Sequence, residues 1–273
     1  MAVPDATSAR LRRLIAALFV LFAMPVFAQP PARIAIIIDD LGNNRMLGLQ
    51  AVALPGALTY SILPQLPYSE RLAHAAHAAG KEVMLHLPMQ SSDGRPLGPG
   101  ALRLGMTRED FGYTVRAALA TVPYAAGVNN HMGSLLTRHP AAMHWLMEDL
   151  SCYNRLYFVD SRTDVRTVAR HSAREAGLAH AQRDVFLDNE PNTEYVRGQF
   201  RRLLSLAKQR GSAIGIGHPY PETLAALAEE LPTLAAQGVE LVPASQLVEL
   251  NRSPKLWHAS SSPLPTVAKN SRQ

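Results

Sequence analysis

Two adjacent carboxylates, Asp39 and Asp40, follow the most apolar segment of the chain, residues 34–38. A segment that is aliphatic at every position is typical of a strand buried on both faces. Polar residues that follow such a strand lie at the carboxyl edge of an α/β sheet, where these folds carry their chemistry. Two acids at that edge suit a metal site or a proton-transfer site. The structural alternative is that one of them caps a helix beginning near Asn43.

Polar residues end other apolar segments as well. They are His86 after residues 83–85, His131 within 127–134, Asp160 after 156–159, Asp188 after Leu187, and His218 after 213–217. In a barrel of parallel strands all of these ends converge on one rim. A carboxylate and two imidazoles with an open position are the ligand set of catalytic zinc and related divalent ions, which polarise a carbonyl. A further carboxylate and a further histidine could then transfer protons.

His86 could be a structural core residue, and the expected surroundings of His218 favour one of its charge states. His86 follows an apolar strand, and a buried histidine is often a hydrogen-bonded core residue rather than a ligand. His218 lies just before Pro221 and Glu222, at the start of an expected helix. Because the positive end of a helix dipole disfavours a second positive charge, we expect a neutral, proton-accepting imidazole at His218.

The elements that must position these side chains alternate along the chain. Helical segments end at glycines and an apolar strand follows each; the glycines are Gly80, Gly177, Gly211 and Gly238. Further strands are expected over residues 58–63, 127–130 and 156–159, and one strand is expected to reach Asp188. About eight strands with helices between them predict a parallel sheet, closed into a barrel of seven or eight strands. An open doubly wound sheet is the alternative, although no G-x-G-x-x-G sequence follows the first strand.

The two ends of the chain differ from its body. Residues 1–28 are predicted to be an export signal, because three arginines precede a short apolar run that small residues end. We therefore expect a mature protein that begins near Gln29, is periplasmic or secreted, and has no membrane span after signal removal; an uncleaved anchor is the alternative. Residues 252–273 are rich in Ser, Pro and basic residues and are predicted to be a disordered tail. Residues 29–251 remain as one domain.

The net charge of +5 comes from those two ends. Without them, the 27 basic and 22 acidic residues fall to 20 and 21. A near-neutral body without a basic stripe predicts that nucleic acid is not a partner. Cys152 is the only cysteine, so no intrachain disulfide can form, and its place on an expected helix is typical of a small core residue.

A long polar loop is expected over residues 91–105, between the strand that carries His86 and a helix that starts near Thr107. Asp110 has capping-box spacing from Thr107. Loops after barrel strands carry specificity while the barrel supplies the frame. We therefore expect this loop to border the rim and to shape a substrate groove.

Five motifs occur in a fixed order along the chain. They are IIIDDLG at 36–42, HLPM at 86–89, NHMGS at 130–134, FVDSRT at 158–163 and GIGHP at 215–219. Together they resemble the divergent polysaccharide deacetylase family over roughly residues 33–250. That family is similar in turn to the NodB-type carbohydrate esterases. The resemblance implies a deformed (β/α) barrel that removes acetyl groups from a polysaccharide such as a cell-wall glycan, with a divalent metal for which zinc is the expected ion.

The resemblance also implies roles for residues at the rim. The first motif of the esterases ends in a general base followed by a metal ligand, which correspond to Asp39 and Asp40. Their last motif carries an acidic histidine, which corresponds to His218. Where the esterases have two metal histidines in one His-x-x-x-His segment, this chain has His86, so we expect His131 to complete the metal site. Residues expected to orient these groups or to contact the substrate are Asn130, Asp160 and Asp188.

Two alternatives to a deacetylase stay open. A glycosidase would use carboxylates from separate strand ends, Asp40 with Asp160 or Asp188, about 5–9.5 Å apart and without metal. A barrel without catalysis would bind a glycan or a cell-envelope partner. Asp40, His86 and His131 lying too far apart to share one ion would support that alternative.

Overall fold

The computed structural model describes residues 30–153 and 155–252 of the chain. The export signal predicted over 1–28 and the predicted tail, apart from Arg252, lie outside the described residues. The described part is built from strands that alternate with helices along the sequence.

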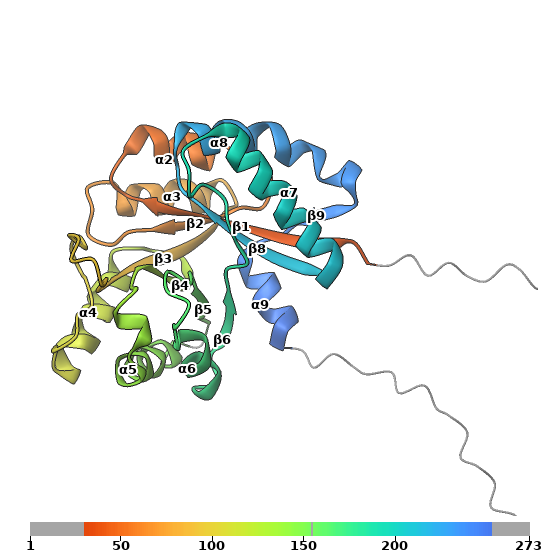
Figure 1. The fold of residues 1–273 in the computed structure, drawn as a ribbon. Coiled ribbons are helices and arrows are strands. Elements are labelled where there is room, and N and C mark those ends of the chain that lie inside the picture. The colour runs from red at the N-terminus through yellow and green to blue at the C-terminus, as the bar shows by residue number, and fades with distance from the viewer. Residues whose placement is uncertain (1–29, 154, 253–273) are drawn as a thin grey trace, which may run out of the picture. The chain divides into compact units, whose positions relative to one another are not determined.

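Nine strands in the described part form one parallel sheet (Figure 1). They are β1 (Ala32–Leu41), β2 (Thr59–Ile62), β3 (Glu82–Met89), β4 (Ala125–Met132), β5 (Tyr157–Asp160), β6 (Ala179–Gln182), β7 (Val185–Phe186), β8 (Ser212–Gly217) and β9 (Val239–Leu241). Eight of them follow the order β6-β5-β4-β3-β2-β1-β8-β7, while β9 pairs with the start of β1. The sheet curls into a deformed (β/α) barrel, which confirms the first prediction over the open doubly wound sheet.

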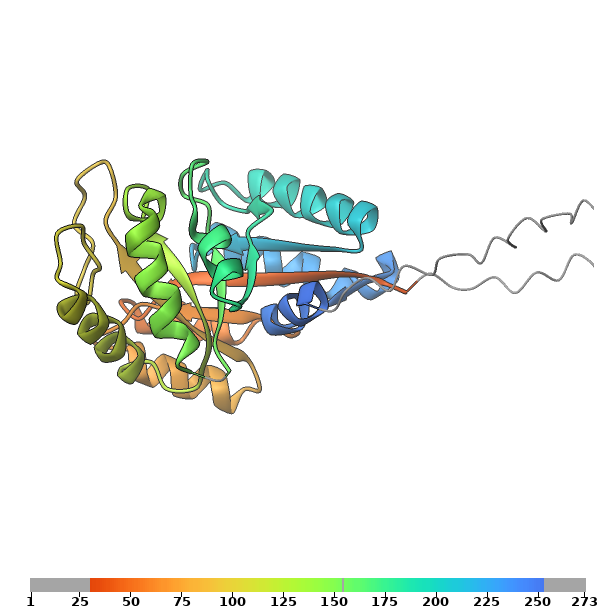
Figure 2. The same cartoon turned by 90° about the horizontal axis from the view of Figure 1, so that it is seen from below.

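Helices surround the curled sheet, as Figures 1 and 2 show. They are α2 (Arg45–Val52), α3 (Ser69–Ala78), α4 (Arg108–Ala120), α5 (Pro140–Ser151), α6 (Ala169–Glu175), α7 (Thr193–Arg210), α8 (Pro221–Glu230) and α9 (Ala244–Arg252), with 3-10 turns η1 (Leu136–Arg138), η2 (Leu231–Thr233) and η3 (Ala235–Gln237). None of these helices has both the length and the apolar character needed to cross a membrane.

Helix α7 illustrates how the sequence fixes a strand that carries a functional residue. Asn192 caps its first turn by accepting from the backbone N–H groups of Glu194 and Tyr195, and Gly211 ends it at φ +89°. Between these ends, Phe200 and Leu203 lie on a buried stripe that packs against β1 and β8. Burying a side chain of that size stabilises the fold by roughly 1.5–3 kcal/mol. The stripe therefore holds β8 in place.

The sheet has a seam between β6 and β7, where the sequence predicted a single strand reaching Asp188. That prediction is wrong, because β6 pairs with β5 and β7 with β8, at opposite ends of the strand order. The chain crosses from one edge to the other through Arg183 and Asp184. The Asp184 carboxylate accepts a hydrogen bond from the Ile214 N–H at 2.9 Å, which satisfies a backbone group of β8 beside the short β7.

Two local predictions near helix ends had different outcomes. Thr107 caps α4 by accepting from the Asp110 N–H at 3.1 Å, as its spacing predicted. Cys152 was expected in the core, but it is exposed at the end of α5. The apolar face of α5 is completed by residues such as Leu146 and Leu150, so the cysteine falls beyond the buried stripe.

Candidate metal centre and active site

The end of β1 turns so that both of its acids face one site. The pairing of β1 with β2 shifts between Ile38 and Leu41, and Asp40 has a left-handed φ of +59°. Successive residues of a regular strand point to opposite faces, and this bulge removes that restriction. Gly42 also has a positive φ, of +130°, but the turn begins at Asp40 itself.

Neither acid is needed to cap the helix that follows. Asn44 accepts a hydrogen bond from the Leu47 N–H at 3.1 Å and so caps α2. The structural alternative for Asp39 and Asp40 therefore loses its basis, because the cap is already supplied by another side chain.

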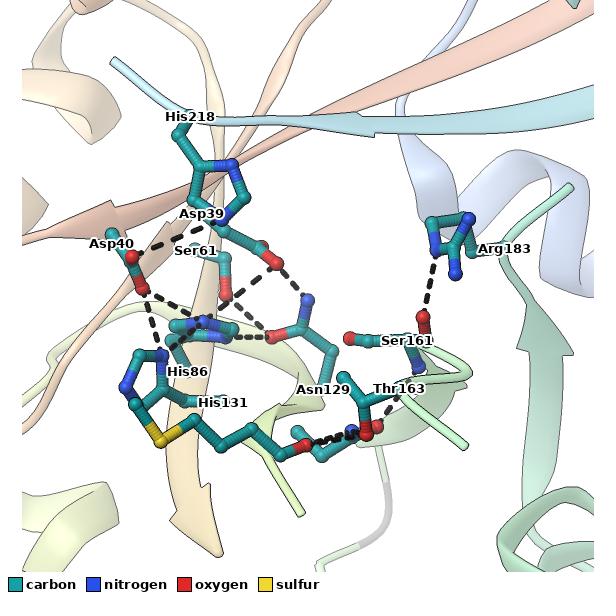
Figure 3. A network of polar contacts seen from close by, with 12 residues as sticks. Asp39, Asp40, Ser61, His86, Asn129, His131, Ser161, Thr163, Arg183 and His218 are labelled. Atoms are coloured by element: carbon teal, nitrogen blue, oxygen red, sulfur yellow. Dashed lines mark hydrogen bonds and ion pairs between the residues drawn. The ribbon is translucent and has the colours of Figure 1, made fainter. Parts of the chain in front are cut away.

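Asp40, His86 and His131 come together at the carboxyl ends of β1, β3 and β4 (Figure 3). Asp40 Oδ1 lies 3.1 Å from His86 Nε2 and 2.9 Å from His131 Nδ1, and the two imidazole nitrogens are 3.1 Å apart. Ligand atoms bonded at about 2.0–2.1 Å to a tetrahedral zinc ion are about 3.3 Å from one another. The three nearest atoms thus have the spacing of ligands that share one ion. We call Asp40, His86 and His131 the ligand group.

Two further observations favour a cation at this point. Asp40 Oδ1 is buried, and the polar atoms close to it in the described part of the chain are the His86 and His131 nitrogens, which would be ligands of the same ion. The Asp40 side chain as a whole stays 31 % exposed, whereas His86 is 2 % exposed. The centre is therefore anchored on a buried side and open on the other, as a catalytic metal site requires.

Asn129 connects the deepest ligand to the neighbouring acid. Its Oδ1 lies 2.7 Å from His86 Nδ1 and accepts from the Ser61 hydroxyl at 2.6 Å, while its Nδ2 donates to Asp39 Oδ1 at 2.8 Å. Because an amide oxygen accepts, His86 Nδ1 carries the proton and Nε2 is left with a lone pair. Asn129 therefore sets the His86 tautomer that can bind a metal.

Asp39 lies beside the ligand group rather than within it. Its Oδ2 is 3.7 Å from His86 Nε2, and its side chain is 4 % exposed. Burial raises the pKa of Asp39, although the charges of His86 and His218 and the hydrogen bond from Asn129 lower it in part. A carboxylate with a raised pKa next to a reaction site is suited to accept a proton.

The pKa values of Asp40 and His86 shift in opposite directions. Burial alone would raise the pKa of Asp40, but hydrogen bonds and charges from His131 and His86 hold it well below its usual range. Burial alone would lower the pKa of His86, but the Asp39 and Asp40 carboxylates raise it. Asp40 is thus ionised and ready to bind a cation, for which the His86 proton competes.

His218 follows β8 and faces Asp39 and Asp40 from the other side of the site (Figure 3). Asp188 accepts from His218 Nδ1 at 3.0 Å and from the His218 backbone N–H at 2.5 Å, and the Thr223 hydroxyl donates to Asp188 at 2.7 Å. The Nε2 atom remains turned toward Asp40, 3.8 Å from its Oδ2. Asp188 therefore holds His218 rather than contacting the ligand group.

The charge expected at His218 was wrong. Burial would lower its pKa, but the hydrogen bond that His218 donates to Asp188 and the charges of Asp40, Asp188 and Asp39 raise it from 6.5 to about 9. These three carboxylates outweigh the dipole of α8, whose effect is confined to about one turn. His218 is thus a proton donor at neutral pH.

The other two predicted residues organise the loop after β5. Asp160 accepts from the Arg162 N–H at 2.8 Å and from the Thr167 hydroxyl at 2.9 Å. Asn130 accepts from the Ser161 N–H at 2.9 Å and donates to the Met132 carbonyl at 2.7 Å. Both side chains use their hydrogen-bonding atoms on the protein itself, and neither contacts the ligand group.

Asn129 and Ser61 were not predicted as site residues from the sequence, which indicated Asn130 instead. The strand alternation puts Asn129 on the side of His86 and Asn130 on the side of Ser161. The signal that could have found Asn129 is its period-two spacing from His131, which places both on one face.

Ser161 is a further polar residue near the site. Its hydroxyl is buried and has no hydrogen-bond partner among the described residues. Arg183 donates to the Ser161 carbonyl at 2.7 Å and to the Arg162 carbonyl at 3.0 Å, and its guanidinium lies 4.9 Å over the Phe186 ring. Arg183, which lies between β6 and β7, therefore holds the backbone of the segment that follows β5.

A curled parallel barrel with these residues at its carboxyl rim defines a class, the deacetylase-like (β/α) barrels. The model of the divergent polysaccharide deacetylase family matches residues 36–248, and the chain belongs to that family. It is also 39 % identical over 239 residues to the uncharacterized protein YibQ of Escherichia coli strain K12, covering 87 % of this chain and 73 % of that one.

Solved structures share the fold. The uncharacterized protein ATU2773 from Agrobacterium tumefaciens C58 has a TM-score of 0.77 at 23 % identity, covering 84 % of this chain and 94 % of its own. A mutant of BA3943 of Bacillus anthracis, a CE4 family pseudoenzyme with restored enzymatic activity, has a TM-score of 0.51 at 14 % identity, covering 80 % of this chain and 68 % of its own. These likenesses concern the barrel alone.

Proposed function

We propose that this protein is an exported, metal-dependent deacetylase that removes acetyl groups from a polysaccharide, such as a cell-wall glycan. The observation that carries the proposal is the meeting of Asp40, His86 and His131, whose ligand atoms all lie within 4.8 Å of one another. Membership of the divergent polysaccharide deacetylase family supports the substrate class. A divalent ion, with zinc as the proposed one, would supply Lewis-acid polarisation of the acetyl carbonyl there.

Two residues beside the ligand group carry out the proton transfers, Asp39 as the base and His218 as the acid. Asp39, buried and with a raised pKa, accepts a proton from the water that attacks the acetyl carbon. His218, protonated at neutral pH, gives its Nε2 proton to the nitrogen or oxygen that leaves as the carbon–heteroatom bond breaks. The products are acetic acid, which ionises to acetate, and the free amine or hydroxyl; Asp39 then releases its proton to solvent and His218 regains one, so the protons balance. Asp188 keeps His218 oriented through Nδ1.

The contacts disfavour a glycosidase. Such an enzyme needs two carboxylates with oxygens free for the substrate. Asp160 and Asp188 both use their oxygens on hydrogen bonds within the protein. His86 and His131 both point at Asp40, and the glycosidase mechanism includes no step that requires two imidazoles beside a catalytic carboxylate. A barrel that only binds is disfavoured by the close spacing of the three ligand atoms.

The test is metal analysis combined with acetate release. Protein expressed as the full chain should contain close to one equivalent of divalent metal and release acetate from N-acetylglucosamine oligomers or O-acetylated glycans. Chelation should abolish release, and zinc should restore it. A matched control is His144→Gln. It removes an exposed histidine that pairs with Glu148 and does not belong to the ligand group, so metal content and acetate release should both stay unchanged. Bound metal without acetate release from any acetylated glycan would reject the catalytic proposal and support the binding alternative.

The location proposed from the sequence needs a separate test. Residues 1–28 are proposed to direct the chain to the periplasm or outside the cell. Fractionation of cells that express the full chain should recover the protein outside the cytoplasm, with the N-terminus of the recovered protein near Gln29. Recovery from the membrane with Met1 retained would instead identify an anchor.

A further inference from the structure

A basic cavity lies beside the segment that follows β5. It has a volume of about 320 Å³ and opens between the 160–167 loop, α6 and β6. Its titratable lining residues are Arg162, Arg170, Arg174, His171, His180 and Asp160. The cavity is thus lined by three arginines and one acid, although the body of the protein is close to neutral.

The positive charge of these arginines is not neutralised by the protein. Within the described part of the chain, no carboxylate oxygen lies within 4.0 Å of the guanidinium of Arg162, Arg170 or Arg174. By contrast, Arg166 in the same loop forms an ion pair with Asp164 at 2.9 Å. The arginines at the cavity therefore differ from their neighbour, and their charge is available to a ligand.

The acidic groups near the cavity are already engaged. Asp160 is fully buried, both of its oxygens accept hydrogen bonds from the protein, and burial raises its pKa. Glu175 at the end of α6 lies 3.1 Å from His171 Nε2, and His171 Nδ1 contacts Arg174 Nη2 at 2.8 Å. Neither acid therefore occupies the space that the arginines surround.

The backbone that carries Arg162 is held in an unusual conformation. Arg162 has φ +50°, which costs free energy for a residue with a side chain. Asp160 accepts from the Arg162 N–H, and Arg183 donates to the Arg162 carbonyl, so both peptide groups are fixed. These contacts fix the backbone at Arg162, whose side chain is exposed at the cavity.

The same segment borders the proposed active site. Ser161 precedes Arg162 and has a buried hydroxyl that lies toward Asn129 in Figure 3. Arg183, which holds the carbonyls of both residues, stacks over Phe186, and the Phe186 ring lies 5.3 Å from that of His218. One short segment thus separates the catalytic groups from the basic cavity.

We propose that this cavity binds an oxyanion, a carboxylate or a phosphate, carried by the glycan chain next to its acetylated sugar. This inference rests on the proposed function for the identity of the polymer, but the oxyanion site itself does not. Arginine forks recognise planar carboxylates and phosphates through paired charge-assisted hydrogen bonds. The protein would in this way select anionic polysaccharides over neutral ones.

The binding test uses three sugars of similar size: glucuronate, glucose 6-phosphate and glucose. Their binding is measured by NMR titration on the Asp40→Asn variant, which needs neither metal nor turnover. One or both charged sugars should bind and glucose should not. In the Arg170→Gln/Arg174→Gln double variant, affinity should fall about tenfold or more. The control Arg201→Gln/Arg202→Gln removes the same charge from exposed positions on α7 and should bind like the parent.

A preference for glucuronate assigns a carboxylate and a preference for glucose 6-phosphate assigns a phosphate. Binding of neither, or equal loss in the control double variant, would overturn the site. In the active enzyme, the kcat/KM advantage of an N-acetylglucosamine–N-acetylmuramic acid tetramer over the neutral N-acetylglucosamine tetramer should shrink in Arg170→Gln/Arg174→Gln. Failure of the proposed function is distinguishable, because it would leave oxyanion binding intact while no acetate is released.

Discussion

At the scale of single residues, Asp39 and Asp40 show how adjacent identical side chains acquire different chemistry. Asp39 is buried and hydrogen-bonded to Asn129, and Asp40 points one carboxylate oxygen at two imidazoles. Burial dominates the first environment and positive neighbours dominate the second, so the pKa of Asp39 rises and that of Asp40 falls. This difference predicts different outcomes for the same substitution.

Asp39→Asn should retain metal but reduce kcat by a factor of roughly 10²–10⁴, the usual contribution of a general base. Asp40→Asn should lose both metal and activity, because an amide is a poor substitute for a charged ligand. Metal content and acetate release measured on both variants check this. Full activity in Asp39→Asn would remove it as the base, and unchanged metal content in Asp40→Asn would remove that residue from the ligand set.

Asn129 should contribute to both stability and metal affinity. Asn129→Leu keeps the volume but leaves His86 Nδ1 and Asp39 Oδ1 without their partner, at about 1–3 kcal/mol for each buried group. Loss of a residue that orients a metal ligand commonly weakens metal binding about 10–100-fold. Thermal unfolding and zinc titration measure the two effects.

The control for Asn129 is Asn44→Ala, which removes the cap of α2 at a cost of about 1 kcal/mol. It should lower stability without changing zinc affinity. If Asn129→Leu also left zinc affinity unchanged, Asn129 would be a packing residue rather than one that sets the His86 tautomer.

His218 predicts a pH dependence of stability in the metal-free protein. Its pKa rises from 6.5 to about 9 on folding, so the folded state holds the proton more tightly. The stabilisation is fully present below about pH 6.5 and is lost as the pH rises through about 9. The difference in Tm between wild type and His218→Gln, measured with chelator, should therefore shrink over that window. A constant difference would contradict the Asp188–His218 interaction as its source.

At the scale of elements, the loop over residues 91–105 packs against the barrel more closely than its polar composition suggested. Leu97 is 3 % exposed and Leu102 is fully buried, and the Leu102 N–H donates to the Pro88 carbonyl at 2.9 Å. The Ser92 N–H donates to the Ser134 hydroxyl at 2.9 Å, close to the strand end that carries His131. The loop thus borders the rim, as predicted, while Leu97 and Leu102 anchor its second half in the core.

Replacing only the exposed tip, residues 93–95, by Gly-Ser-Gly should leave Tm nearly unchanged and raise KM for long glycans. The matched core change Leu102→Ala should instead cost about 2–5 kcal/mol of stability. Thermal unfolding and kinetics on short and long oligomers separate the two. A tip variant with wild-type KM on every substrate would show that the loop does not contact the glycan.

At the scale of the whole molecule, metal binding should stabilise the barrel because its ligands come from three strands far apart in sequence. Zinc at about 100 times its Kd adds about 2.7 kcal/mol to the free energy of unfolding. For a domain of this size that corresponds to a rise in Tm of roughly 5–10 °C. Calorimetry of the metal-free protein with and without zinc measures it. His144→Gln should show the same rise and Asp40→Asn none; an equal rise in Asp40→Asn would place the ion elsewhere.

The strands and helices followed from the sequence because their signals are local. The aliphatic run of β1, the alternation of helix and strand, and a glycine such as Gly211 after α7 each depend on residues close together in the chain. The rim also followed, because parallel strands all end on the same edge. Asp40, His86 and His131 could therefore be predicted to meet, although 91 positions separate the first from the last.

Only the tertiary structure decided the finer points, and the reasons are physical. Asn129 and Asn130 are the same residue type, so composition cannot say which one faces His86; the phase of the strand does. The charge of His218 depends on Asp188, which lies 30 positions away and reaches it through the pairing of β7 with β8. The seam between β6 and β7 depends on which edge each short strand pairs with. Each of these is a long-range contact, and a sequence pattern reports only local ones.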